Sequence, residues 1–148
     1  MSLLRQGVRM LRMGDHGLCI SPDGPGGPSL RVQDGALYFA KMTGAPIIPV
    51  CFSASRSWFQ DRWDRYLVAL PFSKVVCKVG EPIFVNSKIS RDDFENLRHG
   101  LENIMVSQVR ELDKKFNLMQ VEQDLKSSSF KKMRRAQRAE RKNKKRGK

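Results

Sequence analysis

Residues 21–28 constrain the fold of this chain more than any other segment. They read Ser-Pro-Asp-Gly-Pro-Gly-Gly-Pro, a composition that neither a helix nor a central strand tolerates. A short apolar run at residues 17–21 precedes them and is typical of a buried strand. Residues 35–44 follow with the length of a short helix that ends at Gly44. We therefore expect a loop across residues 22–34, placed between a strand and a helix.

Two further helices are predicted, one near each end of the chain. Residues 2–13 carry leucine and valine on one helical face and Arg5, Arg9 and Arg12 on the other. Ser90 followed by Asp93 is typical of a helix start. After it, apolar residues recur every three or four positions as far as Met119, which predicts a helix of about seven turns. We expect this apolar stripe to pack on a sheet, although a coiled-coil seam has the same spacing.

Strand-like segments lie between these helices. Four segments are predicted as strands or turns: residues 46–52, 66–70, 75–79 and 82–85. The connection at residues 53–65 contains Trp58, Phe59 and Trp63, whose rings fit either a membrane interface or packing over a sheet edge. The alternation of helices and strands predicts an α/β fold, with helices packed on the faces of a central mixed sheet, a long C-terminal helix and a basic tail.

The net charge of +13 is concentrated in the tail. Residues 126–148 contain twelve Lys and Arg and one acid, a net charge of +11, which leaves +2 for residues 1–125. We expect residues 1–119 to form the folded domain and residues 120–148 to be disordered or conditionally helical. Such a tail binds an anionic membrane surface or nucleic acid, or is only a solubilising extension. Phe130 is its single aromatic residue, so base stacking is poorly supported and a membrane is favoured.

The cysteines and histidines argue against several kinds of site. Cys19, Cys51 and Cys77 are odd in number and form no C-x-x-C pair, which excludes a disulfide framework and a zinc site. Each lies in an apolar run, so we expect buried, unreactive thiols. His16 is predicted in a solvated turn and His99 on the long helix. We expect no metal and no cofactor. No apolar run is long enough to span a bilayer, and the N-terminus does not read as a signal peptide.

The loop at residues 21–28 is the strongest candidate for a binding site. Ligands of α/β sheets bind in loops at the carboxyl ends of strands, and glycines allow a ligand to approach the backbone. Asp23 adds a carboxylate, but these residues contain no Lys or Arg to neutralise a phosphate. On physical grounds alone, a rigid structural turn is therefore the favoured interpretation.

Five segments in sequence order resemble the bacterial lysophospholipid acyltransferase-like superfamily, and in particular a branch described as a domain of unknown function. They are residues 20–28, 35–50, 62–65, 70–73 and 79–85. The first begins Ile-Ser-Pro-Asp-Gly-Pro and the second ends Gly-Ala-Pro-Ile-Ile-Pro-Val, and the two together are specific. The resemblance covers about half the chain and implies that it holds the C-terminal half of an acyltransferase-like domain.

This resemblance implies a reaction and a set of site residues. Members of the superfamily transfer a fatty acyl group from acyl-CoA or acyl-carrier protein to a hydroxyl of a lipid acceptor. Asp23 stands where the family's acid lies, Gly26 stands where this branch has a basic residue, and Arg31 is the candidate substitute. The implied substrate-binding residues are Ser21, Pro22, Asp23, Gly24, Pro25, Gly26, Arg31 and Pro49.

The family's general base is absent from this chain. That base is the histidine of an H-x-x-x-x-D motif, in which the aspartate orients the ring. Five positions after His16 is Ser21, and five after His99 is Ile104, so neither histidine forms the motif. In the family the motif precedes the segment that residues 1–14 match. We therefore expect no catalytic residue here, no acyl transfer by the chain alone, and an unpaired sheet edge with exposed apolar surface.

Together these features predict part of a lipid acyltransferase that acts on a lysophospholipid or a lipid A-type acceptor. The expected location is the cytoplasm, peripheral to the inner face of the cytoplasmic membrane. Two alternatives stay open. One is a non-catalytic lipid- or membrane-binding remnant, and the other is a small basic nucleic-acid-binding protein in which the loop is only a turn.

Overall fold

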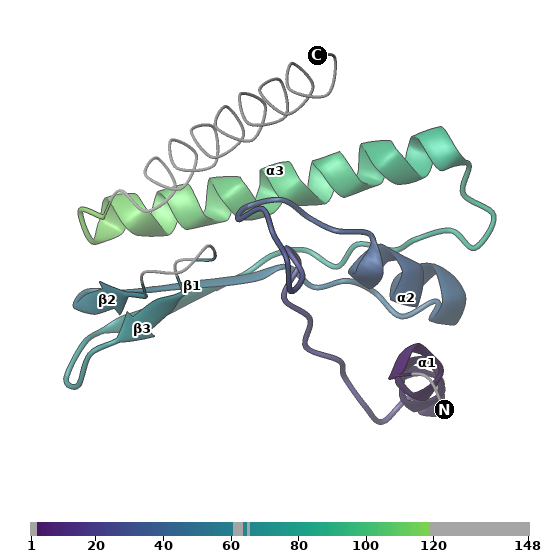
Figure 1. The fold of residues 1–148 in the computed structure, drawn as a ribbon, viewed down its shortest axis with the longest axis horizontal. Helices are drawn as coiled ribbons and strands as arrows, with labels where there is room; N and C mark the ends of the chain where they lie inside the picture. The colour runs from purple at the N-terminus through teal and green to yellow at the C-terminus, as the bar shows by residue number, and fades with distance from the viewer. Residues whose placement is uncertain (1–2, 61–63, 65, 119–148) are drawn as a thin grey trace, which may run out of the picture.

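The computed structural model describes residues 3–60, 64 and 66–118 (Figure 1). Three helices and four strands form this described part, so the predicted α/β class is confirmed. They are α1 (Leu3–Met13), α2 (Gly35–Thr43), β1 (Val50–Ala54), β2 (Ser57–Phe59), β3 (Leu67–Ala69), β4 (Val75–Val79) and α3 (Arg91–Lys115). The long helix α3 extends over the strands at one end and over α2 at the other (Figure 1).

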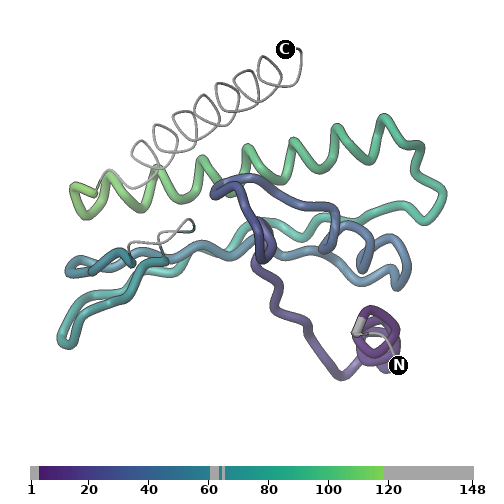
Figure 2. Tube along the Cα trace, in the orientation of Figure 1, coloured from purple at the N-terminus to yellow at the C-terminus, as the bar shows by residue number. Residues whose placement is uncertain are grey.

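The four strands form two antiparallel pairs, whereas a single mixed sheet was expected. β1 pairs with β4 so that Phe52 lies opposite Cys77, and β2 pairs with β3 so that Trp58 lies opposite Val68. The two pairs continue one another as a single ribbon (Figure 2). Consecutive strands here are joined by short connections, and a parallel pair would need a crossover of a dozen or more residues. The connection expected at residues 53–65 therefore contains β2.

Two predicted strands differ in extent from the structure. β1 begins at Val50 rather than at residue 46, and the strand expected at residues 82–85 is reduced to one bridge between Ile47 and Ile83. Pro49 has no N–H to donate, which interrupts the ladder between that bridge and β1. The strands predicted at residues 66–70 and 75–79 are confirmed as β3 and β4.

Residues 17–21 do not form the buried strand that their apolar sequence predicted. They lie between α1 and the loop and pair with no strand in the described part of the chain. Leu18 is 42% exposed and Cys19 is also exposed. A strand needs a neighbour for its backbone hydrogen bonds, and periodicity alone does not report whether one is present.

The core lies where α3 meets α2 and the end of the loop. Its buried side chains are Val32, Leu37, Phe94 and Leu101. Farther along, α3 packs on β1 and β4, with Leu112 buried at 4% exposure, so the docked-helix interpretation is confirmed. The predicted helix start is confirmed too, because Ser90 Oγ accepts a hydrogen bond from the backbone N–H of Asp93 at 3.1 Å.

The two N-terminal helices pack on each other. Gly7 faces the Phe39 ring so closely that a Cβ at this position would lie 2.7 Å from Phe39 Cε1. Gly44 ends α2 as predicted: its φ is 75°, and its N–H donates to the carbonyl of Ala40. Gly7 and Gly44 therefore set where α1 and α2 lie.

The ribbon buries one face and leaves the other exposed. Cys51 and Ser53 of β1 are buried on the side of α3. On the opposite side, Val50, Phe52 and Val79 are 48%, 44% and 64% exposed. This agrees with the expectation of exposed apolar surface. The basic tail, Trp63 and the predicted domain boundary after Met119 lie outside the described residues.

Candidate functional site

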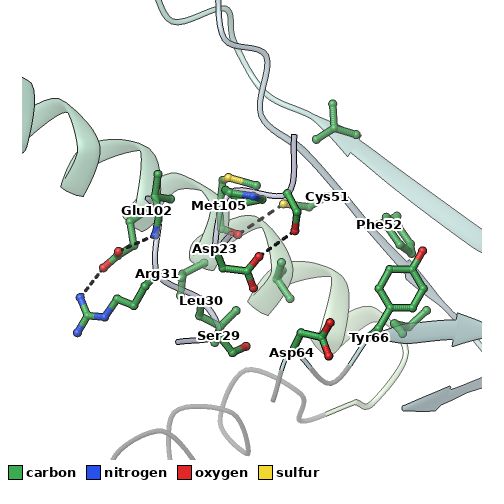
Figure 3. Close-up of a pocket in the computed structure, with 17 residues that line it drawn as sticks. Asp23, Ser29, Leu30, Arg31, Cys51, Phe52, Asp64, Tyr66, Glu102 and Met105 are labelled. Atoms are coloured by element: carbon green, nitrogen blue, oxygen red, sulfur yellow. Dashed lines mark hydrogen bonds and ion pairs between the residues drawn. The ribbon is translucent and has the colours of Figure 1, made fainter. Parts of the chain in front are cut away.

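The loop that follows residue 21, the ribbon and α3 line a cavity of about 210 Å³ (Figure 3). Its apolar lining includes Leu30, Leu67, Met105, Val106 and Val109. Its polar lining includes Ser21, Asp23, Arg31, Asp64, Tyr66 and Glu102. A mostly apolar cavity with a few polar groups is the usual form of a small-molecule site.

Backbone hydrogen bonds close the loop at its base. The N–H of Gln33 donates to the carbonyl of Pro22 at 2.7 Å, and the N–H of Gly24 donates to the carbonyl of Ser21 at 3.3 Å. Gly24 has φ of 66°, a value that favours glycine. Closed loops of this length are compact, self-packed and frequently functional. The turn chemistry explains why the segment is rich in glycine.

Asp23 is the central polar group of the cavity. Its Oδ1 accepts a hydrogen bond from Ser21 Oγ at 2.8 Å, and the residue is half-buried. Figure 3 places Asp23 among the labelled residues, with Tyr66 and Asp64 to one side and Glu102 to the other. In the described part of the chain no group binds its second oxygen. A carboxylate only accepts hydrogen bonds, so this oxygen suits a hydroxyl of a ligand.

Two side chains of α3 hold the end of the loop. Glu102 Oε2 accepts a hydrogen bond from the backbone N–H of Val32 at 3.0 Å. Arg98 Nη1 donates to the carbonyl of the same residue at 2.9 Å. Val32 is buried at 3% exposure, so both of its backbone groups need a partner within the protein. Helix α3 thereby provides a hydrogen-bond partner for the N–H and the carbonyl of Val32. It also fixes the position of this residue, which directly follows Arg31.

Arg31 lies at the rim of the cavity. Its Nη1 donates to Glu102 Oε1 at 2.6 Å, while the side chain remains 56% exposed. The side chain extends away from Asp23 (Figure 3). A guanidinium has five N–H donors, so its remaining donors are available at the surface while Glu102 limits its movement.

The eight predicted substrate-binding residues do not all lie in the cavity. Four of them line the cavity: Ser21, Pro22, Asp23 and Arg31. Gly24 and Pro25 line a neighbouring groove, and Gly26 is exposed with open space around it. Pro49 is buried outside the cavity, where its carbonyl accepts a hydrogen bond from the N–H of Gly80. The structure thus places Pro49 at the start of β1, under α3, and not beside Asp23.

Sequence reasoning missed Glu102 and Arg98. Both lie on the side of α3 that carries Phe94 and Leu101, where an apolar stripe predicts apolar residues. A charged residue on a docked helix face is almost always paired, so these two interruptions were the available signal. The partner on the loop is about seventy residues away, which the helical spacing does not reveal.

The cysteines divide by environment, so the expectation of three buried thiols is wrong for two of them. Cys51 is buried and lines the cavity, and its Sγ lies 3.7 Å from the carbonyl of Met105. Burial raises the pKa of the Cys51 thiol to about 11, with a smaller contribution from Cys77. Cys19 and Cys77 are exposed. An apolar run does not distinguish a covered strand face from an open one.

The histidines, a metal site and a membrane-spanning helix are the remaining features that the sequence raised. His16 is exposed beside Asp15, and His99 is exposed on α3, as predicted. Across residues 3–60, 64 and 66–118, no group of His, Cys, Asp and Glu is arranged to hold a metal ion. Within the same residues no helix is both long and apolar enough to cross a membrane.

Comparison with known proteins indicates a distant acyltransferase-like relation. The chain is 33% identical over 85 residues to the 1-acyl-sn-glycerol-3-phosphate acyltransferase of Haemophilus influenzae, a match that covers 57% of this chain and 32% of that protein. It is 31% identical over 80 residues to the uncharacterized protein RP090 of Rickettsia prowazekii, covering 54% of this chain and 36% of that protein. The matches thus span about a third of each relative. No family model and no solved structure matches the chain.

Proposed function

We propose that this chain forms the acceptor-binding part of a lipid acyltransferase. In that reaction a fatty acyl group passes from acyl-CoA or acyl-carrier protein to a hydroxyl of a lysophospholipid or lipid A-type acceptor. The single observation that carries the proposal is the cavity, in which Asp23 and Ser21 lie against apolar walls from the ribbon and α3. An amphipathic cavity suits a ligand with one polar and one hydrocarbon part.

The polar groups suggest how such an acceptor is oriented. Among the described residues, the lining places the Asp23 carboxylate beside Ser21 and the Arg31 guanidinium at the rim. The Asp23 carboxylate only accepts hydrogen bonds, which favours hydroxyl groups beside it. Arg31, at the rim, is the residue suited to a phosphate, because a guanidinium binds phosphate with paired N–H donors. The acceptor's hydrocarbon part then contacts the apolar walls.

The catalytic base is not among these 148 residues, because neither His16 nor His99 forms the H-x-x-x-x-D motif. We propose that transfer requires that motif from elsewhere and that this chain alone binds acceptor without acylating it. The proposed location is the cytoplasm at the inner face of the membrane, with the basic tail contributing attraction to anionic lipids.

Binding of 1-acyl-sn-glycerol 3-phosphate to the full chain tests the proposal, by calorimetry with monomeric lipid. Asp23→Asn and Arg31→Gln should each weaken binding about tenfold, since each removes a charge-assisted hydrogen bond. Asp92→Asn and Arg56→Gln make the same changes at exposed positions outside the cavity and should leave binding unchanged. All four variants keep the tail, so its attraction for the phosphate is common to them.

The alternatives give different results in the same experiment. Equal binding by all four variants would place the lipid outside the cavity and end the proposal. Tight binding of an oligonucleotide that the lipid does not displace would favour a nucleic-acid-binding protein. Acyl transfer from acyl-CoA by the isolated chain would show that the missing histidine is not required, and would overturn the assigned role.

A further inference from the structure

Helix α1 carries a basic face without acidic partners. Arg5, Arg9 and Arg12 are exposed at positions that share one side of the helix, and α1 contains no acidic residue. Arg12 donates to the carbonyl of Met42 at 2.9 Å. Within the described residues, no carboxylate forms an ion pair with any of the three arginines. A local concentration of unpaired cations is suited to an anionic partner.

Exposed apolar side chains accompany these arginines. Met10 is 42% exposed and Met13 is 61% exposed, so both side chains leave apolar surface of α1 uncovered. Helices that lie at a membrane surface combine arginine or lysine with exposed apolar side chains in this way. A nucleic acid contact would use the arginines but would leave Met10 and Met13 without a favourable environment.

An apolar groove runs beside α1 toward the candidate site. It has a volume of about 900 Å³, and its walls include Leu4, Met10, Leu18, Ile20 and Phe39. Ser21 and Asp64 line both this groove and the cavity that holds Asp23. The groove beside α1 and the proposed acceptor site therefore adjoin each other at these two residues.

The position of α1 leaves its basic face accessible. Its main contacts are with α2, through the close approach of Gly7 and Phe39. In Figures 1 and 2 it lies at the periphery, apart from α3 and from the ribbon of β1 and β4. A flat partner can reach such a helix without displacing the rest of the fold.

We propose that α1 docks this protein on an anionic lipid surface. Arg5, Arg9 and Arg12 bind lipid phosphates, while Met10 and Met13 enter the head-group region. The choice of a lipid partner rests on the proposed function. Docking itself is measured separately from acceptor binding in the cavity, so either can fail alone.

Vesicle binding by the full chain tests the basic face. The probe is phosphatidylcholine vesicles containing about a third phosphatidylglycerol, compared with phosphatidylcholine alone. The triple variant Arg5→Gln, Arg9→Gln, Arg12→Gln should bind the anionic vesicles at least tenfold more weakly than the unmodified chain. The control Arg56→Gln, Lys74→Gln, Lys88→Gln removes the same charge from exposed positions outside α1 and should change binding less than about threefold.

Fluorescent labels test the contact itself, because two exposed cysteines lie in different parts of the fold. Cys19 lines the groove beside α1, and Cys77 lies on β4. An environment-sensitive dye at Cys19, in a Cys77→Ser variant, should be quenched by vesicles that contain brominated lipid. The same dye at Cys77, in a Cys19→Ser variant, should not be quenched. Retained helix content by circular dichroism confirms that each variant is folded.

Three outcomes would overturn the docking surface. Equal losses in the two triple variants would mean that binding reflects total charge. Quenching at Cys77 without quenching at Cys19 would identify the apolar face of the ribbon as the lipid contact. A larger loss of oligonucleotide binding than of vesicle binding in the α1 variant would point to nucleic acid. Acceptor binding that survives in any of these cases would leave the proposed function standing.

Discussion

Glu102 on α3 accepts a hydrogen bond at 3.0 Å from the backbone N–H of Val32, seventy positions earlier in the chain. Arg98, one helical turn away, donates to the carbonyl of the same residue. Leu30, two residues before Val32, has φ of 62°, a conformation that is unfavourable for a residue with a side chain. The helix thus holds a strained part of the loop, and the loop carries Arg31 at the rim of the cavity.

Replacing Glu102 should therefore destabilise the fold. Glu102→Ala leaves the buried N–H of Val32 without an acceptor, and we expect a loss of about 2 kcal/mol in the free energy of unfolding. Glu102→Gln keeps an acceptor and should lose less. Urea unfolding followed by circular dichroism measures both. Glu111→Ala, which removes the exposed partner of Lys78, should lose less than about 1 kcal/mol. A loss at Glu111 as large as that at Glu102 would contradict this account.

The three thiols should differ sharply in reactivity. Cys19 and Cys77 are exposed, whereas burial raises the pKa of the Cys51 thiol from 9.0 to about 11. At pH 9 about half of an ordinary thiol is ionised, against about one part in a hundred for Cys51. Alkylation with iodoacetamide, followed by peptide mass spectrometry, should modify Cys19 and Cys77 first, and Cys51 should react faster as the pH rises toward 11. Rapid labelling of Cys51 at pH 8 in the folded protein would show that the cavity wall is open.

The helices were predictable because their signals are local. Ser90 and Asp93 lie within one turn, Gly44 directly follows α2, and the apolar spacing after Phe94 needs only the period of a helix. The antiparallel ribbon was harder, since strand pairing depends on the length of connections and on which neighbours are present. Residues 17–21 illustrate the difference: they have the composition of a strand but no partner among the described residues.

The candidate site was predictable only in part. The turn chemistry of residues 21–28 marked the loop, and the family resemblance singled out Asp23 and Arg31. The contacts of Glu102 and Arg98 with Val32 depend on packing between segments that are distant in the sequence, so no local pattern predicts them. Pro49 was predicted as a site residue from the family resemblance alone. In the structure it lies under α3, where it packs at the start of β1.

The cap of α3 provides a test of a local prediction. Ser90 Oγ accepts from the N–H of Asp93, one of the helix's first donors, which otherwise lacks a partner in the helix. Ser90→Ala should lower the free energy of unfolding by about 1 kcal/mol. Ser87→Ala changes an exposed serine before the helix and should lower it by less than about 0.5 kcal/mol. Thermal unfolding monitored at the helix band compares the two variants. If they melt together, Ser90 does not cap α3.

Two glycines inside helices should respond in opposite directions to the same substitution. Gly100 lies in α3 with nothing within 4 Å of a Cβ, so Gly100→Ala should raise the free energy of unfolding by about 1 kcal/mol through helix propensity. Gly7 lies in α1, where a Cβ would meet Phe39 Cε1 at 2.7 Å. In Gly7→Ala the same gain is opposed by overpacking of about 1–3 kcal/mol, so we expect a net loss and a weaker contact between α1 and α2. Urea unfolding gives both values, and Gly7→Ala combined with Phe39→Leu should recover part of the loss by making room. Equal stabilisation by the two alanines would show that α1 is not held against Phe39.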